Sequence, residues 1–405
     1  MRDGLQIAVI GGGAAGFFAA IRCAELHPAH RVTILERGGD FLEKVRISGG
    51  GRCNVCPSES VPRELVKHYP RGGRELMGPF HSFSSSDTVE WFERRGVALK
   101  TEEDGRVFPV TDDSGTIVAC LRNAAKAARV GMLSRQTVVG LKPLDGGWQI
   151  EIAGGSPVIA DRVLLAPGSS KAIWAILGNL GHAIATPVPS LFTFNVSDSR
   201  IEGLQGLSVP NASVRVGKGL RADGPLLITH WGMSGGAILK LSAWGARTLA
   251  GMGYRFECEV NWLGGTTLDQ ILERIRREKE VQARRKVQGK NPFGIPNRLW
   301  NALCEAARIP DHANWADLGK PQIQSLAAEL VAGIYQVTGK GTFKEEFVTC
   351  GGVQLGEVNF KTMESRLLPG IFFAGEVLDI DAVTGGYNFQ AAWTTGWIAG
   401  TAIGN

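Results

Sequence analysis

Residues 5–16 read LQIAVIGGGAAG, so a nearly continuous apolar run leads directly into a cluster of glycines. The run is short and rich in β-branched residues, which is typical of a buried strand in a parallel sheet. A helical pattern follows over residues 14–26 and ends before Pro28, because proline disfavours helical geometry in the residue that precedes it. Residues 31–36 form a second apolar run that ends in an acid. The stretch therefore predicts a strand, a helix and a second strand in one β-α-β unit.

Gly11, Gly13 and Gly16 have the G-x-G-x-x-G spacing of dinucleotide-binding turns. The first glycine makes the tight turn, the second lets the backbone approach a pyrophosphate, and the third lets the helix pack closely on the strand. The helix start presents N–H groups and the positive end of the helix dipole to the phosphates. Glu36 is placed to accept hydrogen bonds from ribose hydroxyls. The pattern indicates a bound dinucleotide and by itself leaves NAD and FAD both open.

The C-terminal end of the chain repeats this arrangement. Residues 368–376 read LPGIFFAGE, a turn and a buried strand followed by an acid, and residues 384–390 read TGGYNFQ before a helix of small residues over 391–403. Glycines again stand at the entry to a helix after a strand, which is where ligands bind in a doubly wound sheet. A single dinucleotide rarely needs both ends of a chain, whereas a long cofactor with a second polar head does. We therefore expect FAD.

Four blocks of sequence, which together span almost the whole chain, resemble the FAD-dependent flavoproteins that include BaiN-type and aminoacetone-oxidase-like proteins. More distantly, the chain is similar to glutathione-reductase-type flavoproteins. The blocks are residues 11–16 with Glu36-Arg37, residues 44–54 (KVRISGGGRCN), residues 229–237 (THWGMSGGA), and residues 349–388 with TCGGV, TMES, GEVLD and GGYN. The resemblance implies an α/β fold: a Rossmann-like FAD-binding domain with a parallel sheet, an inserted β-barrel-like domain and a small helical domain.

The resemblance also implies which residues contact FAD. It places Val138 at the adenine, Gly375 and Glu376 on the ribitol and pyrophosphate side, and the turn before Tyr387 beneath the isoalloxazine ring. The full set of expected FAD contacts is Gly11, Gly13, Ala14, Ala15, Gly16, Glu36, Arg37, Lys44, Ser48, Gly49, Gly50, Gly51, Arg52, Cys53, Asn54, Val138, Ala166, Gly168, Gly375, Glu376, Asp381, Gly386, Tyr387, Asn388 and Phe389.

Residues 161–170 depart from the family pattern. Relatives often have Ala-Thr-Gly-Gly after this strand, whereas this chain has Ala166-Pro167-Gly168. The glycine of the close approach is kept. Pro167 has no N–H, so any contact from that amide is in doubt.

The composition narrows the class of protein. The 405 residues include 44 Lys and Arg against 39 Asp and Glu, and a net charge of +5 is too small over this length for a surface that coats nucleic acid. The 54 glycines are about 13% of the chain, against a usual share of about 7%, which points to tight turns around a ligand. No apolar segment reaches the length of a membrane span. We expect a soluble, cytoplasmic protein without a membrane partner.

The seven cysteines are odd in number and scattered, which favours neither a disulfide scaffold nor a structural zinc site. Only Cys53 and Cys56 lie close together in the sequence, and we expect small buried thiols there, with a flavin-linked redox pair as the minor alternative. No metal site is expected.

The nucleotide-binding pattern is interrupted between residues 188 and 345. Short β-rich runs separated by Gly, Pro and Asp-Gly turns predict the barrel-like domain over 188–265 and 335–345. Helical patterns over 267–287, 296–307 and 321–334 predict the helical insert over 266–334. The FAD-binding domain is then discontinuous and comprises residues 1–187 and 346–405.

The helical insert contains a basic stretch. It holds the cations Arg274, Arg276, Arg277, Lys279, Arg284, Arg285, Lys286 and Lys290. One hypothesis is an RNA-modifying or RNA-binding flavoprotein that uses residues 274–290 to contact RNA. Glutamates are interleaved with these cations, which favours an ordinary solvated helix face, so nucleic acid is the less favoured partner.

The favoured function is an FAD-dependent oxidoreductase that transfers two electrons between a small organic substrate and flavin N5. No second G-x-G-x-x-G follows a strand, so NAD(P)H would dock only transiently as electron donor, and oxygen is the alternative electron partner. His230 is the most interesting titratable group, and with Arg52 and Asn54 it would hold an anionic or carbonyl substrate. An NAD-only dehydrogenase leaves residues 375–388 without a role. The substrate and the oligomeric state stay open.

Overall fold

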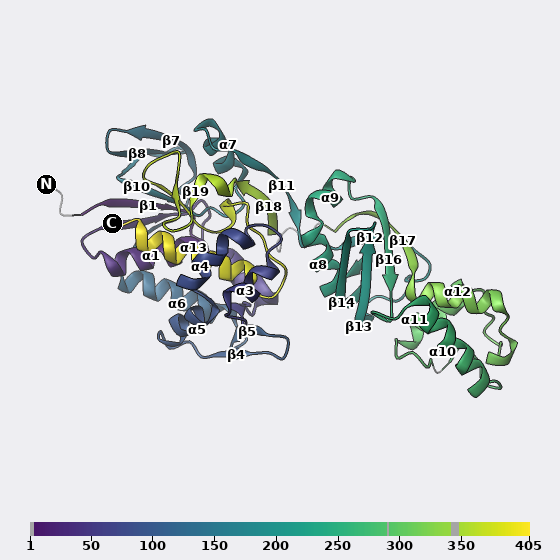
Figure 1. Ribbon diagram of the computed structural model, residues 1–405. Coiled ribbons are helices and arrows are strands. Elements are labelled where there is room, and N and C mark those ends of the chain that lie inside the picture. The colour runs from purple at the N-terminus through teal and green to yellow at the C-terminus, as the bar shows by residue number, and fades with distance from the viewer. Residues whose placement is uncertain (1–3, 290, 342–347) are drawn as a thin grey trace. The chain divides into compact units, whose positions relative to one another are not determined.

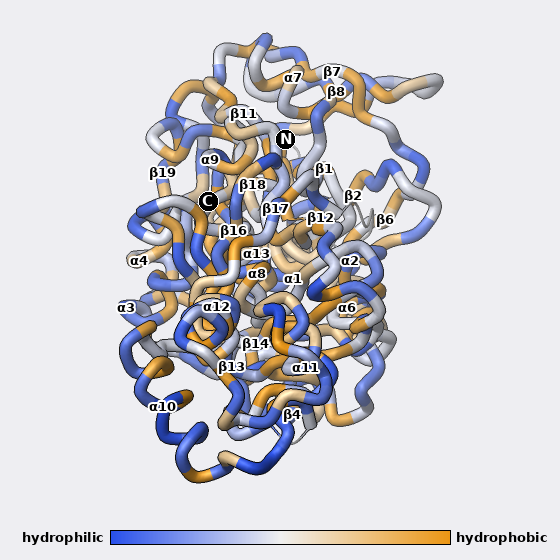
Figure 2. Tube along the Cα trace, turned by 90° about the vertical axis from the view of Figure 1, so that its right-hand side faces the viewer, coloured by the Kyte–Doolittle hydropathy of each residue, from blue (hydrophilic) through white to orange (hydrophobic). Residues whose placement is uncertain are grey.

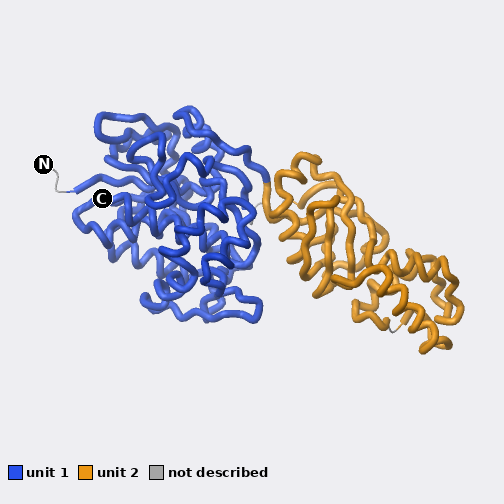
Figure 3. Tube along the Cα trace, in the orientation of Figure 1, with its two compact units in different colours: residues 1–188, 344–405 blue, residues 189–343 orange. Residues whose placement is uncertain are grey.

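The computed structural model describes residues 4–289, 291–341 and 348–405 (Figure 1). By its internal contacts the chain divides into two compact units, residues 1–188 with 344–405 and residues 189–343 (Figure 3). Lys290 of the basic stretch and the predicted domain boundary at 345/346 lie outside the described residues. The separation of a helical domain from the barrel at residue 266 stays a prediction.

A seven-stranded sheet forms the centre of the first unit and confirms the predicted Rossmann-like arrangement. Its order is β19-β20-β21-β10-β1-β2-β6, with β1 between β10 and β2. The five strands β21, β10, β1, β2 and β6 run parallel, and β20 and β19 continue the sheet antiparallel. The strands are β1 (Gln6–Ile10), β2 (Arg31–Leu35), β6 (Gly131–Leu133), β10 (Arg162–Leu165), β19 (Val358–Asn359), β20 (Glu364–Ser365) and β21 (Ile371–Phe373).

The helices of the first unit include both helices predicted beside glycine-rich turns, α1 and α13. They pack against each other, although α1 is the first helix of the described chain and α13 is the last (Figure 1). A Cβ on Gly400 of α13 would lie 2.4 Å from the carbonyl oxygen of Ala19 in α1, so the approach requires glycine. The helices are α1 (Ala14–Leu26), α2 (Glu43–Ile47), α3 (Pro62–Leu65), α4 (Gly73–Ser82), α5 (Ser85–Glu93), α6 (Ser114–Ala127), α7 (Lys171–Asn179) and α13 (Tyr387–Ala402).

Three smaller sheets complete the strands of the first unit. One has the order β3-β5-β4, one has the order β7-β8-β9, and β11 pairs with β18. Their strands are β3 (Cys56–Pro57), β4 (Leu99–Thr101), β5 (Arg106–Pro109), β7 (Val138–Leu144), β8 (Gly147–Ile152), β9 (Val158–Ala160), β11 (Ile184–Ser190) and β18 (Val348–Val353).

The second unit contains a closed six-stranded barrel, which confirms the predicted β-barrel-like insertion. Its order is β12-β15-β14-β13-β16-β17. The strands are β12 (Phe194–Val196), β13 (Ser208–Val216), β14 (Leu220–Thr229), β15 (Gly232–Ser234), β16 (Phe256–Asn261) and β17 (Gly333–Lys340). The helices are α8 (Gly236–Trp244), α9 (Ala246–Gly251), α10 (Leu268–Val281), α11 (Asn297–Ala306) and α12 (Lys320–Val331).

Two predicted helix ends in this unit are wrong. The helix predicted over 321–334 ends at Val331 as α12, and β17 begins at Gly333. Helix α10 ends at Val281, whereas the sequence pattern continues it to residue 287. Val287 is fully buried, its N–H donates to the carbonyl of Ala313, and its own carbonyl accepts from the Trp300 indole. These tertiary bonds replace the helical ones. In the part of the chain that the structure describes, no helix combines the length and the apolar character needed to cross a bilayer.

Candidate functional site

The glycine turn after β1 is shaped by two close approaches and one open space. A Cβ on Gly11, whose φ is +108°, would lie 2.2 Å from the carbonyl oxygen of Ala166. A Cβ on Gly16 would lie 2.0 Å from the carbonyl oxygen of Gly11. A Cβ on Gly13 would meet nothing within 4 Å. The first and last glycines are therefore needed by the protein itself, whereas the middle one faces free space.

This free space lies at the N-terminus of α1. Gly13 is the N-cap residue, no side chain caps the helix, and the first turn carries no acidic residue. The N–H groups of Ala14 and Ala15 belong to that first turn, where helices have orphan donors and a positive dipole end. An anionic group such as a pyrophosphate satisfies both requirements.

Glu36 lies directly beside this turn. One carboxylate oxygen accepts from the N–H of Gly12 at 2.7 Å and the other accepts from the N–H of Gly38 at 2.6 Å. These bonds fix the carboxylate at the end of β2 and still leave lone pairs on both oxygens for ribose hydroxyls. The neighbouring Arg37 is exposed. The Glu36 carbonyl accepts from the N–H of Gln136, so the strand with buried Val138 begins next to it.

A second group of predicted residues gathers where β10 and β21 end. The Lys44 ammonium pairs with the Glu376 carboxylate at 2.7 Å, and a Cβ on Gly168 would lie within 3.5 Å of that carboxylate. A Cβ on Gly375 would lie 3.0 Å from the Ala15 side chain, so this group adjoins the start of α1. Residues some 360 positions apart in the sequence are therefore side by side. The predicted contacts of this group with FAD stay predictions.

The glycine loop, residues 48–54, forms the third group. Gly49, Gly50 and Gly51 all have positive φ angles, and a Cβ on Gly50 or Gly51 would meet nothing within 4 Å. The loop closes on itself through the N–H of Cys53, which donates to the Ser48 carbonyl at 3.0 Å. The backbone is thus held in shape while its glycine surface is open, which suits contact with a flat ring.

The glycine loop meets the start of α13 through Asn54. With its amide oxygen toward the N–H of Gly386 at 3.0 Å and its nitrogen toward the Cys56 carbonyl at 3.3 Å, both polar ends of Asn54 are satisfied. The indole of Trp393 in α13 donates to the carbonyl of Val55 at 2.9 Å. The structure therefore brings residues 48–54 and 386–388 together, as the sequence predicts.

The two thiols near this loop are fully buried and unpaired as a disulfide. Burial raises the pKa of Cys53 to about 12 and raises the pKa of Cys56 as well. Since the thiolate is the reactive form, both are inert at neutral pH. This state agrees with small buried thiols and gives no support to a redox pair.

Residues 68–71, which we call the clamp, hold the turn before α13, and the sequence patterns do not predict this contact. The Tyr69 hydroxyl donates to the carbonyl of Tyr387 at 2.6 Å, and the His68 ring stacks on the Tyr387 ring at 4.2 Å. Arg71 forms a two-point ion pair with Asp381, whose carboxylate is completely buried. The Asn388 amide bonds both the N–H and the carbonyl of Ala382, and Phe389 stacks on Trp393.

These contacts show why the clamp could not be predicted from the sequence. The residues of the 68–71 segment reach partners more than 300 positions away in the sequence, so no local motif announces them. Asp381, predicted as a cofactor contact, has its carboxylate committed to Arg71. Its contact with FAD stays a prediction.

Of the three predicted catalytic residues, Arg52 and Asn54 belong to the glycine loop of the first unit, and His230 belongs to the second unit. Asn54 bridges the glycine loop and α13, as described above. Arg52 bonds to Glu102 at 2.7 Å and to Asp112 at 3.4 Å. His230 lies in the second unit, exposed on the turn between β14 and β15. Their joint action on a substrate stays a prediction.

The residues present fit FAD. The open space over Gly13 and the uncapped start of α1 suit the pyrophosphate. Helix α13 also begins with a glycine N-cap, Gly386, with no side-chain cap and no acid in its first turn. Its dipole suits the negative charge that builds up near N1 of a reduced flavin. When bound, FAD supplies the two-electron chemistry, and these residues bind and orient it. The described residues contain no cluster of three or more His, Cys, Asp or Glu arranged for a metal ion.

Known proteins resemble the whole of this chain. Residues 5–402 match the HI0933-like protein Rossmann domain family. The chain is 27% identical over 408 residues to a 3-dehydro-bile acid delta(4,6)-reductase of Clostridium scindens, covering 98% of each protein. It is 27% identical over 400 residues to a ribosomal RNA dihydrouridine synthase of Escherichia coli, covering 96% of this chain and 95% of that protein.

Solved structures share the fold at much lower identity. A 3-ketosteroid delta1-dehydrogenase from Sterolibacterium denitrificans matches with a TM-score of 0.52 at 13% identity, covering 99% of each chain. A flavocytochrome c3 fumarate reductase matches with a TM-score of 0.50 at 16% identity, covering 98% of this chain and 78% of that one. These two likenesses concern the fold alone. From the family match over residues 5–402, the chain belongs to the HI0933-like Rossmann family and is an FAD-dependent oxidoreductase.

Proposed function

We propose that this protein is a reductase that saturates a carbon–carbon double bond conjugated with a carbonyl group. The supporting observation is the chemistry shared by two relatives that act on unlike molecules. A 3-dehydro-bile acid delta(4,6)-reductase is named for double bonds in a molecule with an oxidised 3-position, and a dihydrouridine synthase is named for a saturated uridine ring. In uridine, the C5=C6 bond is conjugated with the C4 carbonyl.

The proposed reaction balances with NAD(P)H as the reductant. The product gains a hydride at the carbon β to the carbonyl and a proton at the α carbon, so one NAD(P)H and one proton are consumed per double bond. The sequence holds one strand-turn-helix dinucleotide motif, at residues 5–26, so the nicotinamide would visit only transiently. Transient docking permits the nicotinamide and the substrate to use the same face of the flavin in turn.

The residues proposed to shape the reaction lie at the start of α13. Burial raises the pKa of Tyr387 to about 12. Its hydroxyl is protonated at neutral pH, as that of any tyrosine is, and can donate a hydrogen bond. Asn54 and Gly386 join this helix start to the glycine loop. Together they would orient the ring of the cofactor. Negative charge develops on the carbonyl oxygen of the substrate as the hydride is transferred, and a hydrogen-bond donor at that oxygen would stabilise it.

RNA as the substrate is the weaker candidate. The support for it is the name of the Escherichia coli relative and the basic stretch around α10, where hydrophilic residues outnumber the hydrophobic ones (Figure 2). Against it, Glu273, Glu278 and Glu280 alternate with the cations of the same helix, which is typical of a solvated face. A substrate assay distinguishes RNA from a small enone as the substrate.

The test is an anaerobic two-step assay on the purified protein. NADPH or NADH is added first, and bleaching of the flavin absorbance shows which nicotinamide donates electrons. The reduced protein is then mixed with a conjugated steroid enone, a uridine-rich RNA, or the saturated analogue of each. We expect one unsaturated compound to restore the flavin absorbance and to gain two hydrogens by mass spectrometry. Reoxidation by oxygen alone, with every unsaturated compound inert, would refute the proposal.

A further inference from the structure

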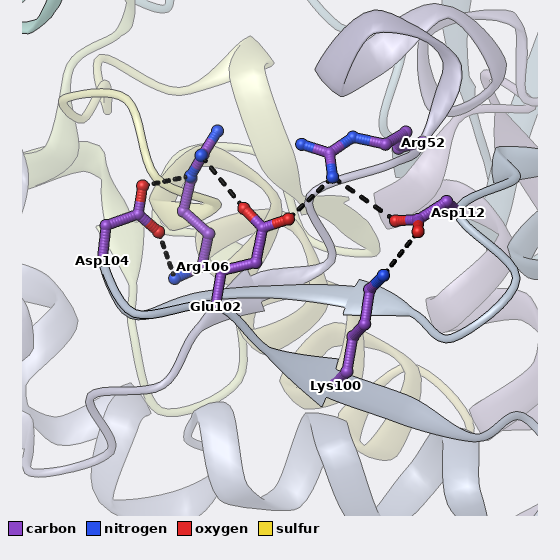
Figure 4. A network of polar contacts seen from close by, with 6 residues as sticks. All are labelled: Arg52, Lys100, Glu102, Asp104, Arg106 and Asp112. Carbon is purple, nitrogen blue, oxygen red and sulfur yellow. Dashed lines mark hydrogen bonds and ion pairs between the residues drawn. The ribbon is translucent and has the colours of Figure 1, made fainter.

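Arg52 stands at the end of the glycine loop and faces the hairpin of β4 and β5. Its guanidinium lies over the Phe108 ring, 4.1 Å from the ring centre. Its Nη1 donates to Glu102 at 2.7 Å and to Asp112 at 3.4 Å (Figure 4). The Glu102 hydrogen bond is the main reason why the pKa of Arg52 is raised. Each of these partners lies on the hairpin or directly after it.

The partners of Arg52 belong to a wider network of alternating charges. Asp112 also pairs with Lys100, and that contact lowers the pKa of the Asp112 carboxyl. Glu102 also accepts from Arg106 at 3.1 Å, and Arg106 pairs with Asp104 at 2.7 Å. Figure 4 shows three cations and three carboxylates joined in one chain. The positive charge of Arg52 is therefore paired with two carboxylates of this network, and both ion pairs use Nη1.

The glycine loop needs such an anchor because its own backbone is unusually free. Three consecutive glycines lose more conformational entropy on ordering than any other residues would. Gly49 and Gly50 are exposed, and Cys53 adopts a left-handed conformation with φ of 59°. The Phe108 ring lies beside two residues of the loop, because Arg52 covers it and a Cβ on Gly49 would lie 3.4 Å from it.

The glycine loop is hydrogen-bonded to the start of α13, so the conformation of the loop affects that helix start. Two positions after Arg52, Asn54 accepts from the N–H of Gly386, and Val55 accepts from the indole of Trp393. The hairpin also pairs with this segment directly, because the N–H of Val55 donates to the carbonyl of Val107 at 2.8 Å. A loosened loop would therefore also loosen the start of α13.

We propose that Arg52 is a positioning residue, which ties the glycine loop to the β4–β5 hairpin and holds it in the shape that receives FAD, and that it does not bind the substrate. The proposal rests on the FAD contact expected of residues 48–54 and is independent of which double bond is reduced. It replaces the substrate-holding role that the sequence suggests for Arg52.

The test measures FAD affinity of the apoprotein in Arg52→Met, Glu102→Gln and the double variant. Asp104→Asn is the matched control, because Asp104 belongs to the same network but does not touch Arg52. We expect each single variant to weaken FAD binding by about three- to tenfold, the range for a partly exposed charge-assisted hydrogen bond. The double variant should be no weaker than the worse single one, since both remove one interaction. Arg52→Lys should restore part of the loss.

A second measurement separates this role from its rival. Hydrogen exchange of residues 48–54 should quicken in both single variants and not in the control. If Arg52 instead binds an anionic substrate, Glu102→Gln frees the guanidinium and lowers KM, Arg52→Met raises KM, and FAD affinity is unchanged in both. That pattern would overturn the proposal. Failure of the reductase proposal would leave these FAD affinities untouched, and Glu102→Gln probes the same contact should Arg52→Met not fold.

Discussion

Gly13→Ala is the substitution that best separates cofactor binding from folding. Gly13 has φ of −91° and ψ of −169°, an extended conformation that alanine adopts without strain. An added Cβ would meet no protein atom within 4 Å. The apoprotein should therefore stay folded, with a change of about 1 kcal/mol or less in its free energy of unfolding, since alanine is a poorer N-cap residue than glycine. The methyl group would instead occupy the space over the α1 N-terminus in which we expect the pyrophosphate.

The size of the effect follows from the cost of overpacking. An extra methyl group in a filled site costs about 1–3 kcal/mol. This corresponds to a rise in the Kd for FAD of about 5- to 150-fold. The Kd is measured by fluorescence quenching as FAD is added to apoprotein, and unfolding is followed by circular dichroism.

Two other glycines serve as controls for Gly13→Ala. Gly178→Ala changes an exposed position in α7 where a Cβ also meets nothing, so it should leave the Kd unchanged. Because alanine favours a helix over glycine, it should raise the free energy of unfolding by about 1 kcal/mol. Gly16→Ala places its Cβ 2.0 Å from a backbone oxygen and should destabilise the apoprotein itself. An unchanged Kd in a folded Gly13→Ala variant would show that the pyrophosphate does not lie over this turn.

Three further predictions concern the clamp, the thiols and the basic helix. Asp381→Asn removes the buried charged partner of Arg71 and should lower the free energy of unfolding by about 3–5 kcal/mol. Glu376→Gln, at the exposed pair with Lys44, should lower it by less than about 1 kcal/mol. Urea titrations measure both values. Cys53 stays neutral in the folded protein up to about pH 12, while an unfolded thiol ionises near pH 8.5, so stability should be intact below pH 8.5 and fall as the pH rises toward 12. Iodoacetamide labelling of Cys53 in native protein at pH 8, read by mass spectrometry, would contradict this. Replacing Arg276 and Arg277 by alanine should leave turnover unchanged. If the protein instead retains RNA on filters in a salt-sensitive way, and these two changes abolish that retention, the basic helix binds RNA.

Local patterns in the sequence were sufficient to predict the elements that line the candidate site. Gly11 and Gly16 were predicted from their spacing as the glycines of the turn and of the close helix contact, and their Cβ positions are blocked in the structure. The strand at residues 5–10 is predicted from its apolar run, which is nearly continuous because the strand lies buried inside the parallel sheet. These features depend on neighbours within a few residues, so a local pattern contains them.

The residues that support the site were not predictable in this way. The carboxylates that Arg52 contacts lie 50 and 60 positions later, and nothing near Arg52 in the sequence reveals them. Arg71 and Asp381 are 310 positions apart, and either one alone reads as an ordinary charged residue. An ion pair is a property of two positions, and one sequence gives no sign that these positions meet.

The convergence of the two chain ends does have a local signal, in the spacing of small residues along α13. Gly396 and Gly400 are four positions apart and so share one face of the helix, as do Ala15 and Ala19 in α1. Because Gly396 meets Ala15 and Gly400 meets Ala19, the two helices run parallel. Helix α13 begins nine residues before Gly396, and at about 1.5 Å per residue its N-terminus extends about 14 Å past that contact. The N-termini of α1 and α13 are both uncapped and are offset along the same direction. One positive helix end is thus available to a phosphate and the other to a distant ring, and a single mononucleotide would not require both.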